Sequence, residues 1–123
     1  MRPVLLVISD LLFRSRIDDA ARHASVPLRV AKSMDQLERH LSKETPSMAI
    51  VDLETDTIDT SAAIRRLRAV PDGESLPILA YAGHTNIDAI KAGREAGAGV
   101  VLARSAFAAQ LPAILARAAG AAE

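Results

Sequence analysis

Two short apolar runs, each leading to an aspartate, constrain the fold of this chain more than any other feature. One run lies within Ser47–Glu54 and ends at Asp52, and the other is Val4–Ile8, which Asp10 follows by two residues. An unbroken apolar run rich in β-branched residues is typical of a strand buried on both faces, and such strands belong to parallel sheets covered by helices. The sequence therefore predicts an α/β fold that delivers two carboxylates to the ends of two strands.

Length, charge and cysteine content narrow the classes of protein. The 123 residues suit a single domain, 1–123, with residues 119–123 expected to fray. The net charge is zero and the basic residues are spread along the chain, so we expect no direct binding to nucleic acid or to a membrane. The absence of cysteine excludes disulfides and thiolate sites. The apolar run after the first residues is too short for a signal peptide or a membrane span, so a cytoplasmic location is expected.

Strand and helix patterns alternate along the whole chain. The predicted strands are 4–8, 28–31, the run ending at Asp52, 76–82 and 100–103, the last one buried. Helical spacing of apolar residues fills each interval, including an inward-facing Ile87 in the fourth helix. The expected helix caps are Ser33, Thr60 or Ser61, and Asn86, with Gly97 ending the fourth helix in the left-handed conformation. Because proline is disfavoured inside helices, Pro112 predicts that the last helix begins near 108–110.

This alternation predicts a topology. Strands joined by helices form right-handed crossovers and a parallel sheet, and the common doubly wound arrangement of five strands is the order 2-1-3-4-5. In that order the first and third strands are neighbours, so Asp10 and Asp52 come together at the point where the strand order reverses. Ligands of open α/β sheets bind at this point.

The residues at these positions resemble the receiver domain of two-component response regulators, which has this flavodoxin-like fold. The resemblance is carried by Asp10 after the first strand and by three segments: Val51-Asp52-Leu53, Pro77-Ile78-Leu79 and Ala96-Gly97-Ala98. It implies that Asp52 is a phosphoacceptor for a histidine kinase, with no enzymatic activity beyond self-catalysed phosphotransfer. It also implies a Mg²⁺ ion held by Asp10, Asp52 and the backbone carbonyl of Glu54.

The match to the receiver pattern is partial. Ser9 replaces the first member of the acidic pair, and Ala82 replaces the hydroxyl residue that holds a phosphoryl oxygen in the family. Arg104 stands at the position of the family lysine, and its planar guanidinium binds differently from an ammonium group. The proline after that lysine is replaced by Ser105, and the aromatic residue of the fifth strand by Val101.

These departures favour a protein-interaction module that works without phosphorylation, a pseudo-receiver. Phosphoryl transfer depends on positioning and charge stabilisation, and each lost charge-assisted hydrogen bond costs about 1.5–3 kcal/mol. Mg²⁺ binding would then be weak or absent. The alternative is a receiver that is still phosphorylated on Asp52, with slowed chemistry. A small-ligand-binding domain is least supported, because no glycine-rich phosphate loop follows the first strand.

The same residues also have structural interpretations. Asp10 is well placed to cap the first helix. Asp52, at a buried strand tip, requires a partner, and we expect a salt bridge from Arg104 that substitutes for the missing cation. Glu54, with the acidic residues that follow it, is expected to be a solvated loop. The expected partners are proteins, including a histidine kinase, an output domain, or a second copy bound through the fourth helix, fifth strand and fifth helix.

Overall fold

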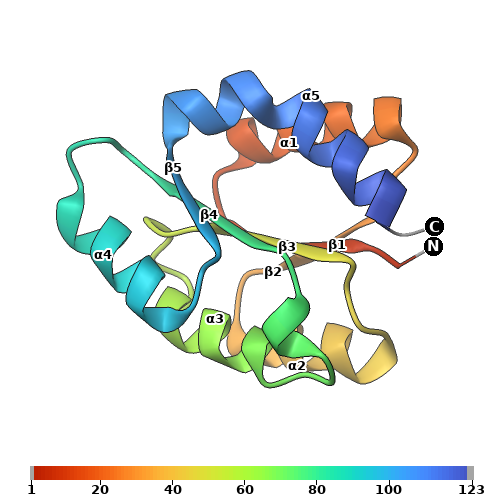
Figure 1. Cartoon of the computed structure of the whole chain (residues 1–123), viewed down its shortest axis with the longest axis horizontal. Coiled ribbons are helices and arrows are strands. Elements are labelled where there is room, and N and C mark those ends of the chain that lie inside the picture. The colour runs from red at the N-terminus through yellow and green to blue at the C-terminus, as the bar shows by residue number, and fades with distance from the viewer. Residues whose placement is uncertain (1, 122–123) are drawn as a thin grey trace.

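The computed structural model describes residues 2–121, and in it a parallel sheet lies between two layers of helices (Figure 1). The strands are β1 (Val4–Val7), β2 (Leu28–Ala31), β3 (Met48–Asp52), β4 (Ile78–Ala82) and β5 (Val100–Ala103). The helices are α1 (Leu11–Ala24), α2 (Met34–Lys43), α3 (Thr60–Arg68), α4 (Ile87–Ala96) and α5 (Arg104–Ala121), with a short 3₁₀ turn, η1 (Gly73–Ser75). No helix within residues 2–121 is long and apolar enough to cross a membrane.

The strand order is β2-β1-β3-β4-β5, which confirms the predicted fold class. Every neighbouring pair of strands is parallel, and β1 lies beside β3 with Val7 opposite Val51. Because parallel strands end at the same edge, the loops after β1, β3 and β4 meet at one edge of the sheet. This is the edge to which the predicted carboxylates belong.

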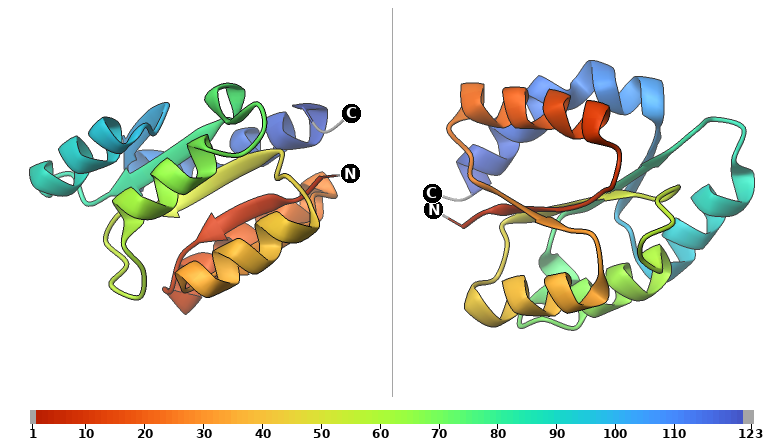
Figure 2. Two further views of the ribbon diagram at one scale, coloured as in Figure 1. Left: turned by 90° about the horizontal axis from the view of Figure 1, so that it is seen from below. Right: turned by 180° about the vertical axis from the view of Figure 1, so that it is seen from behind.

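Alternation of side chains along the strands divides the core in two. Leu6, Ile50 and Tyr81 point toward α1 and α5, whereas their neighbours Val7, Val51 and Ala80 point toward α2, α3 and α4. The two views of Figure 2 show the helices covering both faces. With both faces of the sheet buried, the strand ends are the places left for its polar side chains.

All three aromatic side chains of the sequence meet in one stack on the α1 and α5 side. The ring of Tyr81 contacts Phe13 of α1 and Phe107 of α5, with centroids 5.1 and 4.4 Å away, and the two phenylalanine rings contact each other at 5.6 Å. Such contacts between rings contribute about 0.5–1.5 kcal/mol beyond the burial of apolar area. The stack therefore ties the strand end of β4 to the two helices above it.

Most predicted helix ends are confirmed, and two are wrong. Asp59, not Thr60 or Ser61, caps α3, because its carboxylate accepts the N–H of Ala62. Helix α5 begins at Arg104, directly after β5, and not near 108–110, so Pro112 lies inside it. Apolar residues on both sides of Pro112 are buried on the sheet and hold the helix across the proline, and Figure 1 shows that the helix bends along its length.

Two further expectations of burial are corrected. Strand β5 is an edge strand, not a buried one, and Val100 is 47% exposed. Ile87 is 72% exposed because α4 packs through its small residues, above all Gly93, where an added Cβ would lie 2.8 Å from Leu53 Cδ1. Residues 119–121 continue α5, residues 122–123 lie outside the described residues, and the fraying of 119–123 stays a prediction.

Arg68, at the end of α3, connects the turns that precede β4 and β5. Its guanidinium donates to the carbonyl oxygens of Gly97 at 2.8 Å, Gly73 at 2.8 Å and Leu76 at 2.6 Å. Gly73 and Leu76 belong to the η1 turn and Gly97 ends α4, so one side chain connects α3, η1 and the end of α4. Nothing in the sequence pattern singles Arg68 out from its basic neighbours in α3.

We predict that Arg68→Met lowers the free energy of unfolding by about 2–3 kcal/mol, because the substitution removes charge-assisted hydrogen bonds to these carbonyls. The exposed Arg65 of the same helix provides the control, and Arg65→Met should change stability by less than about 0.5 kcal/mol. Urea denaturation followed by circular dichroism measures both. Equal, small effects of the two variants would show that Arg68 does not have this role.

Candidate functional site

Asp10 and Asp52 lie at the same edge of the sheet, as the topology predicts. Asp52 is the last residue of β3 and is only 5% exposed, and its Oδ1 accepts the N–H of Glu54 at 2.9 Å. Asp10 caps α1 by accepting the N–H groups of Leu12 and Phe13 at 3.0 and 3.1 Å. The structural interpretation of Asp10 is therefore confirmed, and one of its oxygens is engaged in the helix cap.

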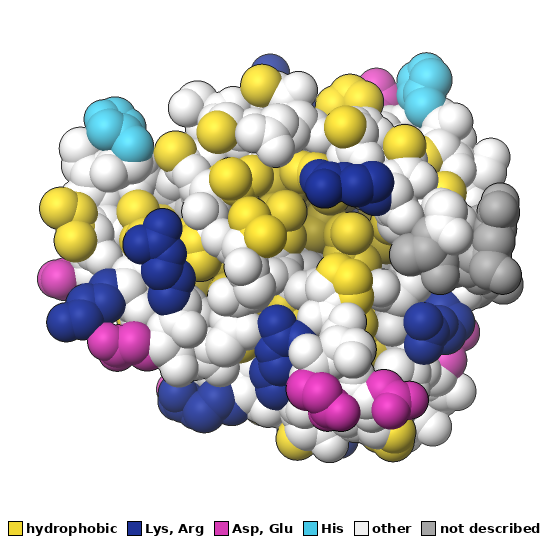
Figure 3. Space-filling view, viewed as in Figure 1, with side chains coloured by type: hydrophobic (Ala, Val, Ile, Leu, Met, Phe, Trp, Pro, Cys, Tyr) yellow, Lys and Arg dark blue, Asp and Glu magenta, His cyan; other side chains and the backbone are white. Residues whose placement is uncertain are grey.

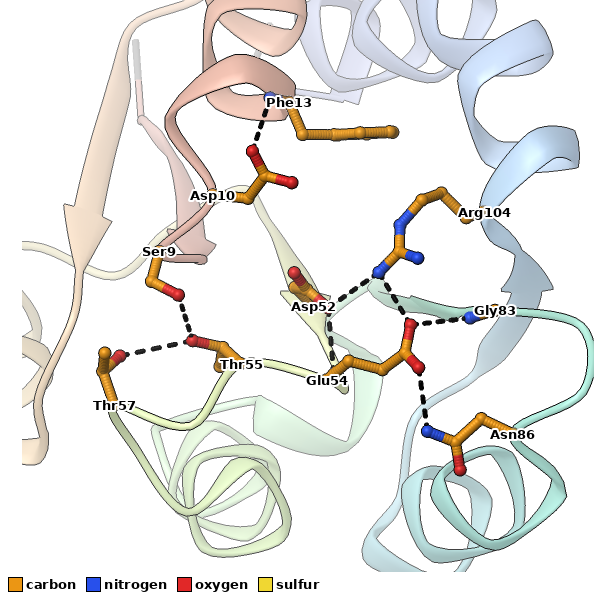
Figure 4. A network of polar contacts seen from close by, with 10 residues as sticks. All are labelled: Ser9, Asp10, Phe13, Asp52, Glu54, Thr55, Thr57, Gly83, Asn86 and Arg104. Carbon is orange, nitrogen blue, oxygen red and sulfur yellow. Dashed lines mark hydrogen bonds and ion pairs between the residues drawn. The ribbon is translucent and has the colours of Figure 1, made fainter.

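Glu54 lies in the exposed loop after β3, as expected, and its carboxylate forms the centre of a polar network. Its Oε1 accepts the backbone N–H of Gly83 at 2.8 Å and lies 2.7 Å from Arg104 Nη2. Its Oε2 accepts the side-chain N–H of Asn86 at 2.9 Å. Figure 4 shows two of these donors on the β4–α4 loop and the third, Arg104, at the start of α5. Glu54 is exposed as expected, but the sequence did not predict that its carboxylate binds groups from two other parts of the chain.

Arg104 is shared between two carboxylates. Its Nη2 lies 3.6 Å from Asp52 Oδ1, so the predicted ion pair is present, but Glu54 is the closer partner. The guanidinium also lies over the ring of Tyr81, 5.7 Å from the centroid. The Nε atom of Arg104 is buried and has no hydrogen-bond partner within residues 2–121. The cation at the family lysine position is therefore held mainly by Glu54.

The two carboxylates have opposite electrostatic environments. Burial raises the pKa of Asp52, and the charges of Glu54 and Asp10 act in the same direction. The Glu54 N–H and the Arg104 charge lower the pKa of Asp52 but do not outweigh burial. The pKa of Glu54 is lowered, first by the hydrogen bond from Asn86 and then by the N–H of Gly83. The network therefore stabilises the charge of Glu54 better than that of Asp52.

Tyr81 is the site residue that the sequence reasoning missed. It lies directly opposite Asp52 in the register of β3 and β4, so the two side chains project from the same face of the sheet. The Tyr81 hydroxyl is buried without a hydrogen-bond partner among the described residues, and burial raises its pKa. Its position one residue before Ala82 was the available signal, because alternation along β4 turns Ala82 to the opposite core.

The remaining family positions carry little chemistry here. The Ser9 hydroxyl lies 2.7 Å from the Thr55 hydroxyl, which in turn lies 3.3 Å from that of Thr57, so these groups tie the β1–α1 loop to the β3–α3 loop (Figure 4). Ala82 is completely buried and has no polar atom in its side chain. Neither position offers a free group toward Asp52.

The residues fit a Mg²⁺ ion poorly. Mg²⁺ in proteins is held in octahedral geometry by one or two carboxylates together with phosphate and water. Within residues 2–121 no group of three or more histidine, cysteine, aspartate or glutamate side chains converges on one point. Asp10 and Asp52 are the two available carboxylates, and each already accepts backbone hydrogen bonds.

Comparison with known proteins gives structural matches only. No family model matches the sequence, and no curated protein does. Among solved structures, one match is a protein of Chloroflexus aurantiacus that is assigned as a response regulator. It is 27% identical with a TM-score of 0.79, and the match covers 97% of this chain and 98% of that chain. The receiver domain of a sensor histidine kinase of Pseudomonas aeruginosa, crystallised with magnesium in its active-site cleft, is 23% identical with a TM-score of 0.79, at coverages of 97% and 98%.

A third match places the same fold within a longer protein. NtrX of Brucella abortus is 18% identical with a TM-score of 0.78, and 97% of this chain covers 27% of NtrX. At such identities the second and third matches show the fold alone. The first match, together with the strand order and the position of Asp52, extends the likeness to the response regulators themselves. These structural matches show that the chain has the fold of a response-regulator receiver domain.

Proposed function

We propose that this receiver domain of signal transduction acts without phosphorylation, as a module that binds proteins. The observation that carries the proposal is the bond between Glu54 and Arg104, 2.7 Å long. In receivers, the cation at this position serves to hold a phosphoryl group. Here that cation is already paired with a carboxylate of the chain itself, so the domain supplies its own anion at this position.

The same carboxylate also fixes the β4–α4 loop. Gly83 and Asn86 belong to this loop, and both donate hydrogen bonds to Glu54. Because Glu54 is exposed to solvent, each of these bonds contributes on the order of 0.2–1 kcal/mol. A phosphoryl group on Asp52 would have to compete with Glu54 for Arg104 before it could alter the loop. This arrangement supports a domain held in one state.

The residues around Asp52 support the same conclusion. Ala82 cannot donate a hydrogen bond to a phosphoryl oxygen, and Ser9 cannot supply the missing carboxylate of the acidic pair. Burial also raises the pKa of Asp52, so its charged form is less favourable in the folded protein than in the unfolded chain. A phosphoryl group there would lack the donors that stabilise the charge developed during transfer.

The face formed by α4, β5 and α5 is the one we propose for a partner or a second copy. Figure 3 shows hydrophobic side chains gathered beneath α5 on this side of the molecule. Val100 of the edge strand is 47% exposed, and Leu102 is half-buried. Receivers occur with histidine kinases or output domains, and a partner of either kind would cover this apolar surface.

A slow phosphoacceptor is the second candidate, and one distance favours it. Arg104 Nη2 lies 3.6 Å from Asp52 Oδ1, within reach of a group attached to Asp52 after a small rotation of the guanidinium. Asp10 is exposed at the same edge of the sheet. The experiments below separate the two candidates.

We predict that the protein is inert toward small phosphodonors. Incubation with acetyl phosphate and Mg²⁺ should give no mass adduct, and beryllofluoride should leave the two-dimensional NMR spectrum unchanged, because Arg104 is held by Glu54. Asp52→Asn is the control for adducts at other sites. An adduct or widespread shifts in the wild type that Asp52→Asn abolishes would establish the phosphoacceptor instead.

We further predict that restoring the missing groups restores phosphorylation. The variant Ser9→Asp/Glu54→Ala/Ala82→Ser completes the acidic pair, releases Arg104 and supplies a hydroxyl with little added volume. Acetyl phosphate should then give an adduct, detected by intact mass, that disappears when Asp52→Asn is added. If circular dichroism shows that the triple variant is folded and intact mass still shows no adduct, these three positions do not explain the lost chemistry.

The two carboxylates should respond to pH with opposite signs. The folded-state pKa of Asp52 is raised above the usual 3.8. Ionisation of Asp52 therefore lowers the stability of the protein as pH rises from 3.8 through the folded-state pKa. Below 3.8 this loss of stability is absent. Asp52→Asn should therefore stabilise the protein by about 1 kcal/mol at neutral pH and have little effect in acid.

Glu54→Gln provides the matched comparison. The folded-state pKa of Glu54 lies below 4.5, so its carboxylate contributes stability above 4.5 that is lost as pH falls through the folded-state pKa. The variant should be about 1 kcal/mol less stable at neutral pH and converge with the wild type in acid. Urea unfolding across a pH series measures both variants. A destabilised Asp52→Asn at neutral pH would mean that pairing with Arg104 outweighs the burial of Asp52.

A further inference from the structure

The edge strand β2 borders an open pocket of about 570 Å³ between α1 and α2. The right-hand view of Figure 2 shows β2 between these two helices. We call this pocket the β2 groove, and its charged lining residues are Arg14, Asp18, Arg29, Lys32, Arg39 and Lys43.

The fold gathers positive charge that is scattered in the sequence. Five lysine and arginine residues and one aspartate line the β2 groove, so its lining carries five minus one, or four, net positive charges. The whole chain has 15 basic and 15 acidic residues and a net charge of zero. One third of the basic residues therefore surround a single pocket, a concentration of charge that their spread along the sequence does not reveal.

Most of this charge is not neutralised within the molecule. Lys32, Arg39 and Lys43 make no salt bridge among the residues that the structure describes. Arg14 reaches Asp18 only at 3.9 Å, and its Nε atom is buried without a hydrogen-bond partner in the described chain. Like charges held close together repel, so a negatively charged ligand in the groove is favoured.

The backbone of β2 is not the recognition element. The carbonyl oxygen of Leu28 accepts a hydrogen bond from Arg29 Nη1, and that of Val30 lies 2.9 Å from His40 Nε2. Side chains that occupy an edge strand in this way protect it from pairing with another strand. Recognition in the β2 groove would therefore act through the charged side chains.

We propose that the β2 groove binds an acidic segment of a partner protein. Aspartate and glutamate carboxylates match the guanidinium and ammonium groups that line it. A nucleic acid is less favoured, because Asp18 lies within the groove, Glu44 pairs with Arg29 at 3.7 Å, and a chain of zero net charge has no long-range field for a polyanion. The proposal does not depend on whether Asp52 is phosphorylated, and the groove contains no residue of the Glu54 network.

The test is binding of the full chain to a short fluorescein-labelled peptide of alternating glutamate and serine, measured by fluorescence anisotropy at low salt. Lys32→Glu/Arg39→Glu/Lys43→Glu should weaken binding by at least about tenfold. The control, Arg65→Glu/Arg94→Glu/Arg117→Glu, changes the net charge equally at exposed positions of α3, α4 and α5 and should stay within about twofold of the wild type. Binding should weaken as salt is added, and a matched lysine peptide should not bind.

Three results would overturn the proposal. The first is an absence of saturable binding to the glutamate peptide at low salt. The second is an equal loss in the two triple variants, which would reduce the effect to net charge. The third is tighter binding of a single-stranded oligonucleotide of equal charge with the same dependence on Lys32, Arg39 and Lys43, which would make the groove a nucleic-acid site. Each readout is independent of the phosphodonor experiments, so this proposal and the proposed function fail separately.

Discussion

Burial of the sheet on both faces is the constraint on which the rest of this structure depends. Because helices cover both sides, a polar side chain on a central strand can reach solvent or a hydrogen-bonding partner only at a strand end. Asp52 is the last residue of β3 but is only 5% exposed, and this burial raises the pKa of its carboxyl group. The neighbouring loops must then arrange their polar groups around a carboxylate that is poorly solvated, and Glu54 and Arg104 are arranged in this way.

Glu54 changes how the site can be understood. In isolation, Asp52 and Arg104 look like a weakened version of a phosphorylation site, in which one cation faces one carboxylate. With Glu54 included, Arg104 Nη2 and the donors of the β4–α4 loop are already bound, and Asp52 is the member with the weaker interactions. The site is therefore organised around a permanent negative charge. A charge that is covalently part of the chain cannot be removed by a phosphatase, and this is consistent with a domain held in a single state.

The sequence predicted the strand order and the positions of Asp10, Asp52 and Arg104, because alternating strands and helices allow few topologies and the strand tips follow from them. It did not predict the role of Glu54. The partners of that carboxylate lie 29, 32 and 50 residues away, and only the geometry of three loops brings them together. Tyr81 was missed because a tyrosine in an apolar strand is indistinguishable from core until the register places it opposite Asp52. The continuous α5 was missed because local rules for Pro112 are overridden by packing on both sides of it.

The stacked position of Tyr81 has an optical consequence. The chain contains one tyrosine and no tryptophan, so its fluorescence at excitation wavelengths that phenylalanine does not absorb originates from this residue. The ring is packed against Phe13 and Phe107 and shielded from water, and the charges of Asp52, Arg104 and Asp10 act on its hydroxyl. The molecule therefore carries a single tyrosine beside its candidate site. We expect its emission to respond, without any label, to a change of charge at that site.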